Sequence, residues 1–464
     1  MLRSIGSMTV LALLMVGCGG GGGGDSGPPP PPPPINGYTV SGTVSGLVGS
    51  GLTLAICHPV NPHGGYGPAR VCNSPRPIGA NGTFALGAAY PADYSGNDHV
   101  SITQQPTSPP QNCVISNAAV STEAANDTGF AVACMDYSEY SYVTNAADNT
   151  LSSYSVNVTT GAVAAIGTPT ATGESPYATA ATAGYVFVGN EVSNDISAFA
   201  VDPTTGALTA VPGSPFAAGT DPKAMVIYQT GGSYNLYVAN AGSDNMSVYT
   251  VDAATGALAG PSTTATGKSP TSIVILNDNL FVANHGGSND ISVFNIGAGP
   301  DAIPVPGSPF PAGGNPLSLA LGANGQFFYS ANPDATNPSI SGFRVDGGGV
   351  LTPLSGSPFP LPVSHYIATD QTGAYLYVTS GASIVGYAID ATTGALTALP
   401  GFPVATGANA YSITIDPTNR TLYVTNDGAA NVSAFTLDAS TGALTPMAGS
   451  PFPAGHHPQF IATF

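Results

Sequence analysis

The tetrad Tyr142-Val-Thr-Asn145 begins a phrase that recurs along the last two-thirds of the chain. Its seven copies stand at 142–145, 187–190, 237–240, 281–284, 329–332, 377–380 and 423–426. The steps between them are 45, 50, 44, 48, 48 and 46 residues. A period of this size in a chain of alternating strands is typical of a propeller with four-stranded blades. Seven tetrads therefore predict seven blades in residues 136–464.

The last copy shows how one repeat divides into strands. It predicts strands at 411–415, 422–425, 432–437 and 443–446, the first and third with apolar and small polar residues in alternation. A Thr-Gly pair recurs at the following turn and supplies a residue that tolerates positive φ. The Asp ahead of this turn is expected to accept backbone N–H bonds, which is a structural role. This Asp stands at Asp202, Asp252, Asp346, Asp390 and Asp438.

The two ends of the repeat array predict how the ring closes. The first copy starts directly at its tetrad and lacks the strand that should precede it. The final residues, 458–464, resemble that missing strand. We therefore expect 457–463 to be the innermost strand of the first blade, which would close the ring without an open sheet edge.

The repeated motifs carry a family resemblance. Tyr-Val-Thr-Asn at 142 and 423, followed by Thr-Gly-Ala-Leu and Gly-Ser-Pro-Phe, resembles the YVTN-repeat β-propellers. These are grouped with the seven-bladed lactonase family, whose known members hydrolyse 6-phosphogluconolactone or related cyclic substrates. The resemblance covers about residues 136–464 and implies the fold. Lactonase activity is implied by the resemblance alone, since none of the matched residues is a catalytic group.

The N-terminus resembles a bacterial lipoprotein signal. One positive charge at Arg3 and a short apolar run at 10–16 precede Met15-Val-Gly-Cys18, which is similar to a lipobox. Residues 1–17 are predicted to be the signal and Cys18 the lipidated residue, so the membrane would be reached through a lipid anchor only. An ordinary secretory signal with an incidental Cys is the alternative. Gly19 after the Cys favours the outer membrane by resemblance to Gram-negative sorting. Residues 18–34, with their Gly and Pro runs, predict a tether.

Residues 35–135 predict a separate small β-sandwich, similar to immunoglobulin-like modules of bacterial surface lipoproteins. Strands are expected at 38–44, 52–56, 83–86, 99–103, 113–116 and 130–134. The four cysteines that remain after Cys18 all lie in this module, and an even count in an exported domain suggests two disulfides. Three connectivities are possible; we favour Cys57–Cys72 and Cys113–Cys134, because each pair brackets a predicted hairpin. A metal site is the alternative, although no suitable Cys spacing supports it.

Composition excludes some partners. The formal charge is −18, and seven Lys and Arg cannot build a surface that tracks phosphates, so no nucleic acid is expected. The chain has no P-loop, Rossmann fingerprint, His-Glu-x-x-His, Gly-x-Ser-x-Gly or EF-hand loop. We expect a monomer without a cofactor.

Ionisable residues gather in two kinds of loop, the one after each tetrad and the one before each inner strand. Both should lie on one rim of the propeller, which we call the top rim. The candidates there are His365, His456, His457 and Glu174 as general bases, and Lys223, Lys268, Asp221, His285 and Glu191 as ligand-binding residues. The alternative is that polar residues collect on the rim of any propeller. Metal binding by His456 and His457 is disfavoured because adjacent imidazoles point apart. Asx turns explain Ser-Asn-Asp at 193–195 and 288–290 better than Ca²⁺ does.

Two functions remain compatible with these patterns. In the first, the propeller is a rigid platform on an envelope lipoprotein and binds an unidentified protein or small molecule at its top rim. In the second, it is a lactonase-like hydrolase. The sequence favours the platform, because a 6-phosphogluconolactone site needs cations for the phosphate, and this substrate is cytosolic whereas the chain is predicted to be exported.

Overall fold

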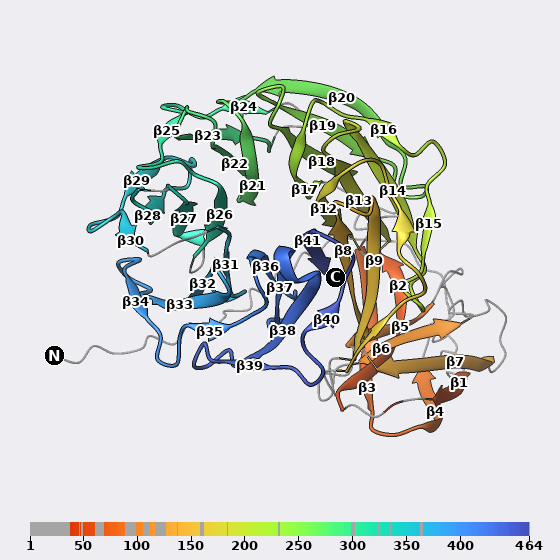
Figure 1. Ribbon diagram of the computed structural model, residues 1–464. Helices are drawn as coiled ribbons and strands as arrows, with labels where there is room; N and C mark the ends of the chain where they lie inside the picture. Colours follow the sequence, from red (N-terminus) through yellow and green to blue (C-terminus); the bar gives the residue numbers. More distant parts are fainter. Residues whose placement is uncertain are drawn as a thin grey trace, which may run out of the picture.

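The computed structural model describes residues 38–45, 47, 50–60, 69–88, 99–104, 111–116, 127–136, 138–157, 162–182, 184–230, 233–297, 302–322, 325–334, 336–361 and 365–463. Within these ranges the chain is all-β, apart from short turns of 3₁₀ helix such as η2 (Asp427–Ala429). Cys18, the predicted signal and the predicted tether lie outside the described residues. Figure 1 shows the larger part of the chain as a ring of sheets around a central axis. We call the centre of this ring, between its innermost strands, the channel.

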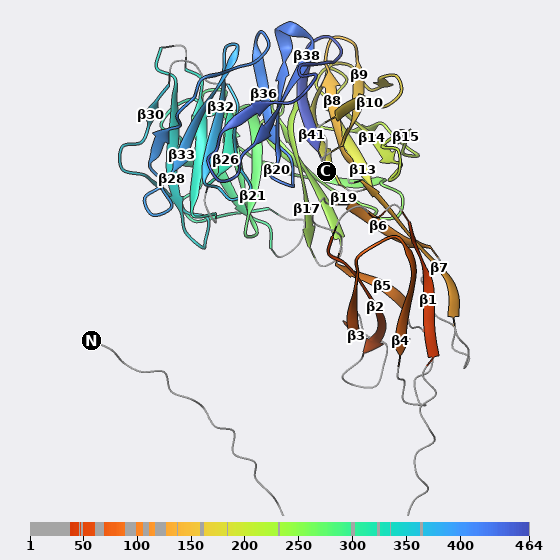
Figure 2. The same cartoon turned by 90° about the horizontal axis from the view of Figure 1, so that it is seen from below.

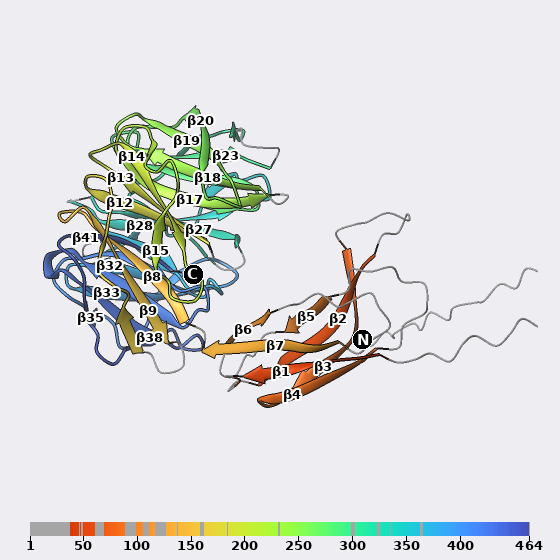
Figure 3. The same cartoon turned by 90° about the vertical axis from the view of Figure 1, so that its right-hand side faces the viewer.

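The first seven strands form two sheets beside this ring (Figures 2 and 3). One sheet has the order β4-β1-β7-β6 and the other β3-β2-β5. The strands are β1 (Tyr38–Ser45), β2 (Leu52–Val60), β3 (Ala69–Ile78), β4 (Gly82–Ala88), β5 (His99–Gln104), β6 (Gln111–Ser116) and β7 (Asp127–Asp136). Side chains from both sheets, including Leu54 and Val132, share one hydrophobic cluster. Six strands match the sequence prediction. Strand β3 was not predicted, because Pro75 and Pro77 disfavour a strand. It lies at the edge of its sheet, where Pro is tolerated.

Seven further sheets make up the ring, one for each predicted blade, and in each of them the strands follow one another from the channel outward. Blade 1 contains β41 (Pro458–Thr463), β8 (Ser138–Asn145), β9 (Thr150–Asn157) and β10 (Ala162–Ala165), with β11 (Thr170–Ala171) also on β9. Blade 2 contains β12 (Pro176–Ala181), β13 (Tyr185–Asn190), β14 (Asp195–Val201), β15 (Leu208–Ala210) and β16 (Phe216–Ala217). Blade 3 contains β17 (Pro222–Thr230), β18 (Ser233–Asn240), β19 (Asn245–Val251) and β20 (Leu258–Ala265).

The other four blades repeat the arrangement of blade 2. Blade 4 contains β21 (Pro270–Leu276), β22 (Asn279–Asn284), β23 (Asp290–Asn295), β24 (Ile303–Pro304) and β25 (Phe310–Pro311). Blade 5 contains β26 (Ser318–Leu321), β27 (Phe327–Asn332), β28 (Ser339–Val345), β29 (Leu351–Pro353) and β30 (Phe359–Pro360). Blade 6 contains β31 (Ile367–Thr369), β32 (Tyr375–Ser380), β33 (Ser383–Ile389), β34 (Leu396–Ala398) and β35 (Val404–Ala405). Blade 7 contains β36 (Ala410–Ile415), β37 (Thr421–Asn426), β38 (Asn431–Leu437), β39 (Leu444–Pro446) and β40 (Phe452–Pro453).

The C-terminal strand closes the ring, as the sequence predicted. β41 pairs antiparallel with β8, so that Ile461 lies opposite Val143 and Thr463 opposite Ser141. Ile461 is 5% exposed and belongs to a cluster that also holds Val432 and Met447 of blade 7. The last residues therefore belong to the first blade and pack against the last one.

Hydroxyls of the tetrads in blades 1, 5, 6 and 7 bond each of these blades to its neighbour. The hydroxyls of Tyr142, Tyr329 and Tyr377 donate to a Gly carbonyl in the Thr-Gly turn of the next blade, at 2.7–2.8 Å. Thr144, Thr379 and Thr425 donate to a carbonyl on the next inner strand, at 2.7–3.0 Å. The Asn at the fourth place bonds within its own blade, from Nδ2 to a Ser that is the third residue of the blade's third strand, as in Asn145 to Ser152 at 2.9 Å. The motif thus stabilises the contacts between blades and the start of each third strand.

The turn that follows the third strand also matches its predicted role. Asp202 accepts bonds from the backbone N–H groups of Thr204 and Thr205, both at 2.9 Å, and these bonds lower the pKa of its carboxyl. Gly206 has φ +70, and a Cβ there would lie 2.3 Å from the ring of Tyr140. Asp252, Asp346, Asp390 and Asp438 accept equivalent bonds. The Asp residues are therefore turn residues, and glycine is required by both backbone conformation and space.

Candidate functional site at the channel mouth

The structure places the predicted polar residues of the propeller on the top rim. In blades 1, 2, 3, 4 and 7 the loop after the tetrad bonds to the loop before the inner strand. Examples are Glu191 N–H to the Ser175 carbonyl at 2.9 Å and His285 N–H to the Ser269 carbonyl at 3.0 Å. In blade 1 the bond runs from Ala146 to the carbonyl of His457, also at 3.0 Å. In blade 6 the N–H of His365 bonds to the tetrad itself, at the Thr379 carbonyl, at 3.1 Å. The two loops therefore lie together on one rim in these five blades.

One residue of each blade occupies an equivalent place at the top of the channel, two positions before the residue that pairs with the second residue of the tetrad. Tyr177, for example, comes two positions before Thr179, which pairs with Val188. In chain order from blade 2 through blade 7 and back to blade 1, the equivalent residues are Tyr177, Lys223, Thr271, Leu317, His365, Tyr411 and Gln459. Two tyrosines, one lysine and one histidine thus share a single layer at the top of the channel. Tyr366 follows His365 and lies one position further along the inner segment of blade 6.

The three tyrosines meet across the channel. The hydroxyl of Tyr177 in blade 2 lies 2.8 Å from that of Tyr366 in blade 6 and 2.6 Å from that of Tyr411 in blade 7. Phe460 packs against Tyr177 and Tyr366, with ring centroids 5.1 Å apart in both pairs. Burial raises the pKa of both Tyr177 and Tyr366 well above the ordinary value of 10, so these groups stay protonated phenols. We call this group the tyrosine bridge.

Lys223 lies beside the tyrosine bridge and forms ion pairs with two carboxylates. Its Nζ lies 4.1 Å from the centre of the Tyr177 ring, 2.7 Å from Glu191 and 3.4 Å from Asp221. Burial raises the pKa of Asp221, and the Lys223 charge acts in the opposite direction. The ammonium is thus oriented by an aromatic face and by two acids. Together Lys223, Glu191 and Asp221 carry one net negative charge when all are ionised.

His365 stands on the other side of the tyrosine bridge. Its ring stacks on Tyr411 with centroids 6.4 Å apart and planes inclined by 30°. Burial lowers the pKa of the imidazole below 6.5, which keeps it neutral at pH 7. Its Nδ1 is buried and has no hydrogen-bond partner in the described part of the chain. A neutral imidazole with an unused ring nitrogen can accept a proton, provided that a substrate or water reaches it.

The remaining candidates do not contact this cluster. The single site that was predicted from the sequence, with all nine candidates, therefore includes too many residues. His456 pairs with Asp148 at 2.9 Å and its side chain is 76% exposed; His457 pairs with Asp427 at 3.0 Å. Lys268, at 71% exposure, lies 3.6 Å from Asp244. His285 lies 3.3 Å from Asn315, and burial lowers the pKa of its imidazole. Glu174 is exposed. The site is therefore Lys223, Glu191, Asp221, His365 and the tyrosine bridge.

Sequence reasoning missed the tyrosines. It sorted rim residues by charge, and a phenol carries none at pH 7. Part of the signal was available, since Tyr177 and Tyr411 share the register of Lys223 and His365 in the repeat alignment. Tyr366 lies one position further along its blade, so the alignment does not group it with them.

Metal-binding clusters and membrane-spanning helices are both lacking in the described part of the chain. Within those ranges no three or more His, Cys, Asp and Glu side chains are grouped so that they could hold a metal ion. No helix there combines the length and apolar character needed to cross a membrane.

Comparison with known proteins identifies the class. The family described as "Lactonase, 7-bladed beta-propeller" matches residues 115–220 and 283–459. The chain therefore belongs to the lactonase family of seven-bladed β-propellers. The unmatched stretch, 221–282, covers all of blade 3 and the innermost strand of blade 4. In blade 3, β20 is one long strand in place of the two short outer strands of the other blades. No curated protein matches the chain.

Solved structures share this fold at low sequence identity. A "putative 6-phosphogluconolactonase" from Bacteroides fragilis is 22% identical, with a TM-score of 0.60 over 71% of this chain and 98% of its own. A protein from Bacteroides uniformis with the same description is 19% identical, with a TM-score of 0.60 over 71% of this chain and 100% of its own. The periplasmic gluconolactonase of Pseudomonas aeruginosa is 18% identical, with a TM-score of 0.59 over 70% of this chain and 98% of its own.

Proposed function

We propose that the propeller hydrolyses an uncharged sugar lactone at the channel mouth. The observation that carries the proposal is the half-buried imidazole of His365, which stacks on Tyr411. Its buried Nδ1 has no hydrogen-bond partner among the described residues, and burial lowers its pKa, so that it is neutral at pH 7. His365 would take a proton from water as the water oxygen bonds to the lactone carbonyl carbon. The Lys223 ammonium or a phenol O–H would stabilise the oxyanion. The ring C–O bond then breaks, and the imidazolium returns the proton to the leaving alkoxide, which yields the open hydroxy acid.

The charge of the site argues for a substrate without a phosphate. Lys223 is the one cation in the described cluster, and Glu191 and Asp221 already offset it. A phosphate would therefore meet net negative charge on a protein whose formal charge is −18. An uncharged sugar lactone meets no such repulsion, and aromatic faces suit the C–H faces of a sugar ring.

The relatives support this choice of reaction. The name of the family is lactonase, and the Pseudomonas aeruginosa protein is named a periplasmic gluconolactonase. At 18–22% identity these structures share the fold, so the choice of substrate rests on the site itself.

The direct test is a panel of lactones with the purified mature chain. We expect turnover of glucono-1,5-lactone above its spontaneous hydrolysis, measured by acid release at constant pH. The 6-phospho derivative should be turned over more slowly at equal concentration. Absence of turnover with every neutral sugar lactone would contradict the proposal.

Sugar binding without turnover is the second candidate. The tyrosine hydroxyls bond to one another, and of the three rings that of Tyr411 stays partly exposed, whereas Tyr177 and Tyr366 are buried. The Tyr411 ring thus offers an aromatic surface whose hydroxyl is already hydrogen-bonded. Such a face is suited to a binding platform on the cell envelope. Binding of gluconate or gluconolactone by titration calorimetry, with no acid release, would favour this candidate over hydrolysis.

We propose that the chain is anchored to the envelope, at the outer membrane, through Cys18. The motif Met15-Val-Gly-Cys18 and the Gly and Pro runs at 19–34 support an anchored, tethered protein. Replacing Cys18→Ser should shift the protein from the membrane to the soluble fraction, because the acyl chains are the hydrophobic anchor that remains after cleavage. Fractionation followed by immunoblotting measures the shift. Unchanged partitioning of the variant would refute the lipid anchor.

We also propose that residues 35–135 form an immunoglobulin-like β-sandwich with two disulfides. The backbone register supports the pairing, because Cys57 lies opposite Cys72 on β2–β3 and Cys113 opposite Cys134 on β6–β7. Peptide mapping without reductant should recover both cross-linked peptides. Cys57→Ser with Cys72→Ser should lower the stability of this module by roughly 3 kcal/mol, the value for a loop of about 15 residues. Recovery of any other pairing would overturn the assignment.

A further inference from the structure

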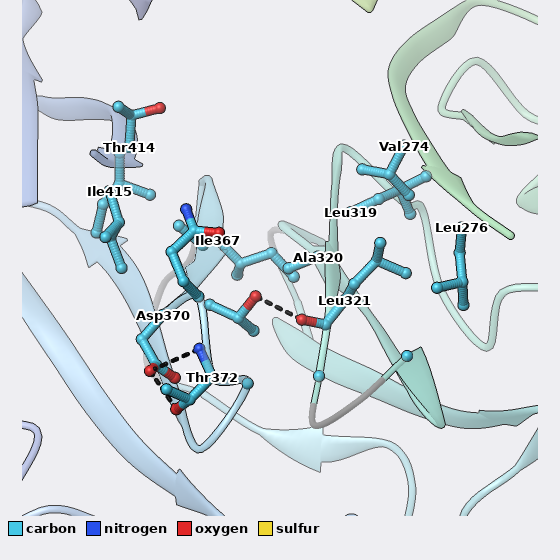
Figure 4. Close-up of a pocket in the computed structure, with 17 residues that line it drawn as sticks. Val274, Leu276, Leu319, Ala320, Leu321, Ile367, Asp370, Thr372, Thr414 and Ile415 are labelled. Atoms are coloured by element: carbon cyan, nitrogen blue, oxygen red, sulfur yellow. Dashed lines mark hydrogen bonds between the residues drawn. The ribbon is translucent and has the colours of Figure 1, made fainter. Parts of the chain in front are cut away.

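A cavity of about 750 Å³ opens at the end of the channel opposite the top rim (Figure 4). Four consecutive inner strands form its walls, β21, β26, β31 and β36, together with the turn at 370–373. Each of these strands starts near the top rim, and the cavity is lined by residues toward their far ends, such as Leu276 on β21 and Ile415 on β36. Its volume lies in the range of small-molecule sites.

One side of the cavity is aliphatic. Val274 and Leu276 of blade 4 face the space with Leu319 and Leu321 of blade 5 (Figure 4). Leu319 is buried, whereas Val274, Leu276 and Leu321 keep partly exposed side chains. A ligand that covers this partly exposed aliphatic surface removes it from water, which stabilises the bound state.

The other side is polar, and its one acid is held by hydrogen bonds. Asp370 is 2% exposed, and its oxygens accept from Tyr375 N–H at 2.8 Å, Thr372 N–H at 3.0 Å and Asn419 Nδ2 at 3.2 Å, and also from the Thr372 hydroxyl. The Thr369 hydroxyl donates to the Leu321 carbonyl. Gln371 and Thr414 add an amide and a hydroxyl to the lining, and the Thr372 hydroxyl oxygen can still accept a bond.

A second carboxylate disfavours anions at this end. Asp416 of blade 7 is fully buried beside the cavity-lining Ile415, and the Gln371 side chain donates to its backbone carbonyl at 3.4 Å. Lys and Arg do not occur among the described residues that line the cavity. A carboxylate or sulfate head group would thus approach two buried acids with no cation in this lining to offset its charge.

We propose that this cavity binds an uncharged amphiphile. Its aliphatic chain would lie against Val274, Leu276 and Leu321, and its hydroxylated head would face Gln371, Thr372 and Thr414. The site is separate from the channel mouth and requires no lactone chemistry.

Octyl glucoside below its critical micelle concentration is the probe, because it joins an aliphatic chain to a neutral hydroxylated head. Titration calorimetry on the mature chain should show one saturable site. Octanoate has a chain of similar length with an anionic head, and we expect it to bind at least about tenfold more weakly. No saturable binding of octyl glucoside, or equal binding of octanoate, would overturn the proposal.

Substitutions that fill the cavity test whether octyl glucoside binds there. Thr414→Phe puts a ring into the space from β36 and should weaken octyl glucoside binding at least about tenfold. Val226→Phe is the matched control, because Val226 faces Tyr237 in the strand pairing as Thr414 faces Tyr423, yet it does not line the cavity. It should change affinity less than about twofold. If Thr414→Phe unfolds the protein, Ala368→Leu on β31 fills the same space with a smaller group. Unaltered affinity in a folded filling variant would contradict the location.

Discussion

A chain that ends after Gly455 is expected to lose the cooperative unfolding of the propeller. The truncation removes β41, and with it the antiparallel ladder to β8 and the buried side chain of Ile461. It also removes Phe460, which packs against Tyr177 and Tyr366. Loss of one large buried side chain costs about 2–5 kcal/mol. Loss of Ile461 and of the partly buried Phe460, together with a whole strand, therefore approaches the stability of a typical domain, about 5–15 kcal/mol.

Thermal melting followed by near-ultraviolet circular dichroism measures this effect. A chain that ends after Thr463 is the matched control, because it keeps all of β41 and should melt like the full chain. A second control adds residues 456–464 as a free peptide, which should restore part of the lost signal if the vacant place in blade 1 persists. Melting of the truncated propeller within a few degrees of the full chain would rule out closure of the ring by β41.

His365→Ala is expected to lower the rate of lactone hydrolysis by about 10²–10⁴-fold, the usual contribution of a general base. The affected quantity should be kcat more than KM, because the imidazole acts on the attacking water and the leaving oxygen. His456→Ala is the matched control on the same rim: its side chain is 76% exposed and paired with Asp148, so turnover should not change. Equal losses in both variants, or turnover that survives His365→Ala, would refute the placement of the base.

The pH profile gives an independent readout of His365. Burial lowers the pKa of its imidazole below 6.5, and the neutral form is the active one. The rate should therefore hold its plateau as the pH falls through 6.5 and decline only below it. Between the folded and unfolded pKa values the unfolded chain binds more protons, so stability also falls as the pH falls through this window. Melting temperatures must accompany each rate. An acid limb at or above pH 6.5 in a folded protein would contradict the assignment.

The repeats allowed the ring, its seven blades and its closure to be predicted, because strand alternation and turn chemistry are local properties. The sequence did not reveal why the tetrad recurs. The hydroxyl of Tyr142 bonds to Gly206, 64 residues away, and that of Thr144 bonds to the Tyr177 carbonyl. Such bonds between blades depend on how neighbouring sheets pack, which a periodic pattern does not state. The short outer strands at the Gly-Ser-Pro-Phe segments were missed for a similar reason, since two residues are too few to show alternation.

The sequence predicted the rim on which the candidate site lies, but not which residues of that rim contact one another. Topology alone put Lys223, Glu191, Asp221 and His365 on one rim. Which of the rim residues meet depends on side-chain direction and on local partners, and Asp148 and Asp427 hold His456 and His457 elsewhere. The tyrosine bridge joins blades 2, 6 and 7, so it becomes visible only when the ring is closed.

The pairing of β41 with β8 also sets the order in which this protein can fold. The bond from Phe460 N–H to the Thr144 hydroxyl joins residues 316 positions apart. Ring closure is therefore a late event, since residues 458–463 leave the ribosome after every other strand of the ring and must then find a partner at the far end of the array. Until that moment β8 presents an unpaired edge, to which a strand of another nascent chain can add. Slow synthesis at low temperature should consequently favour correctly closed monomers over aggregates.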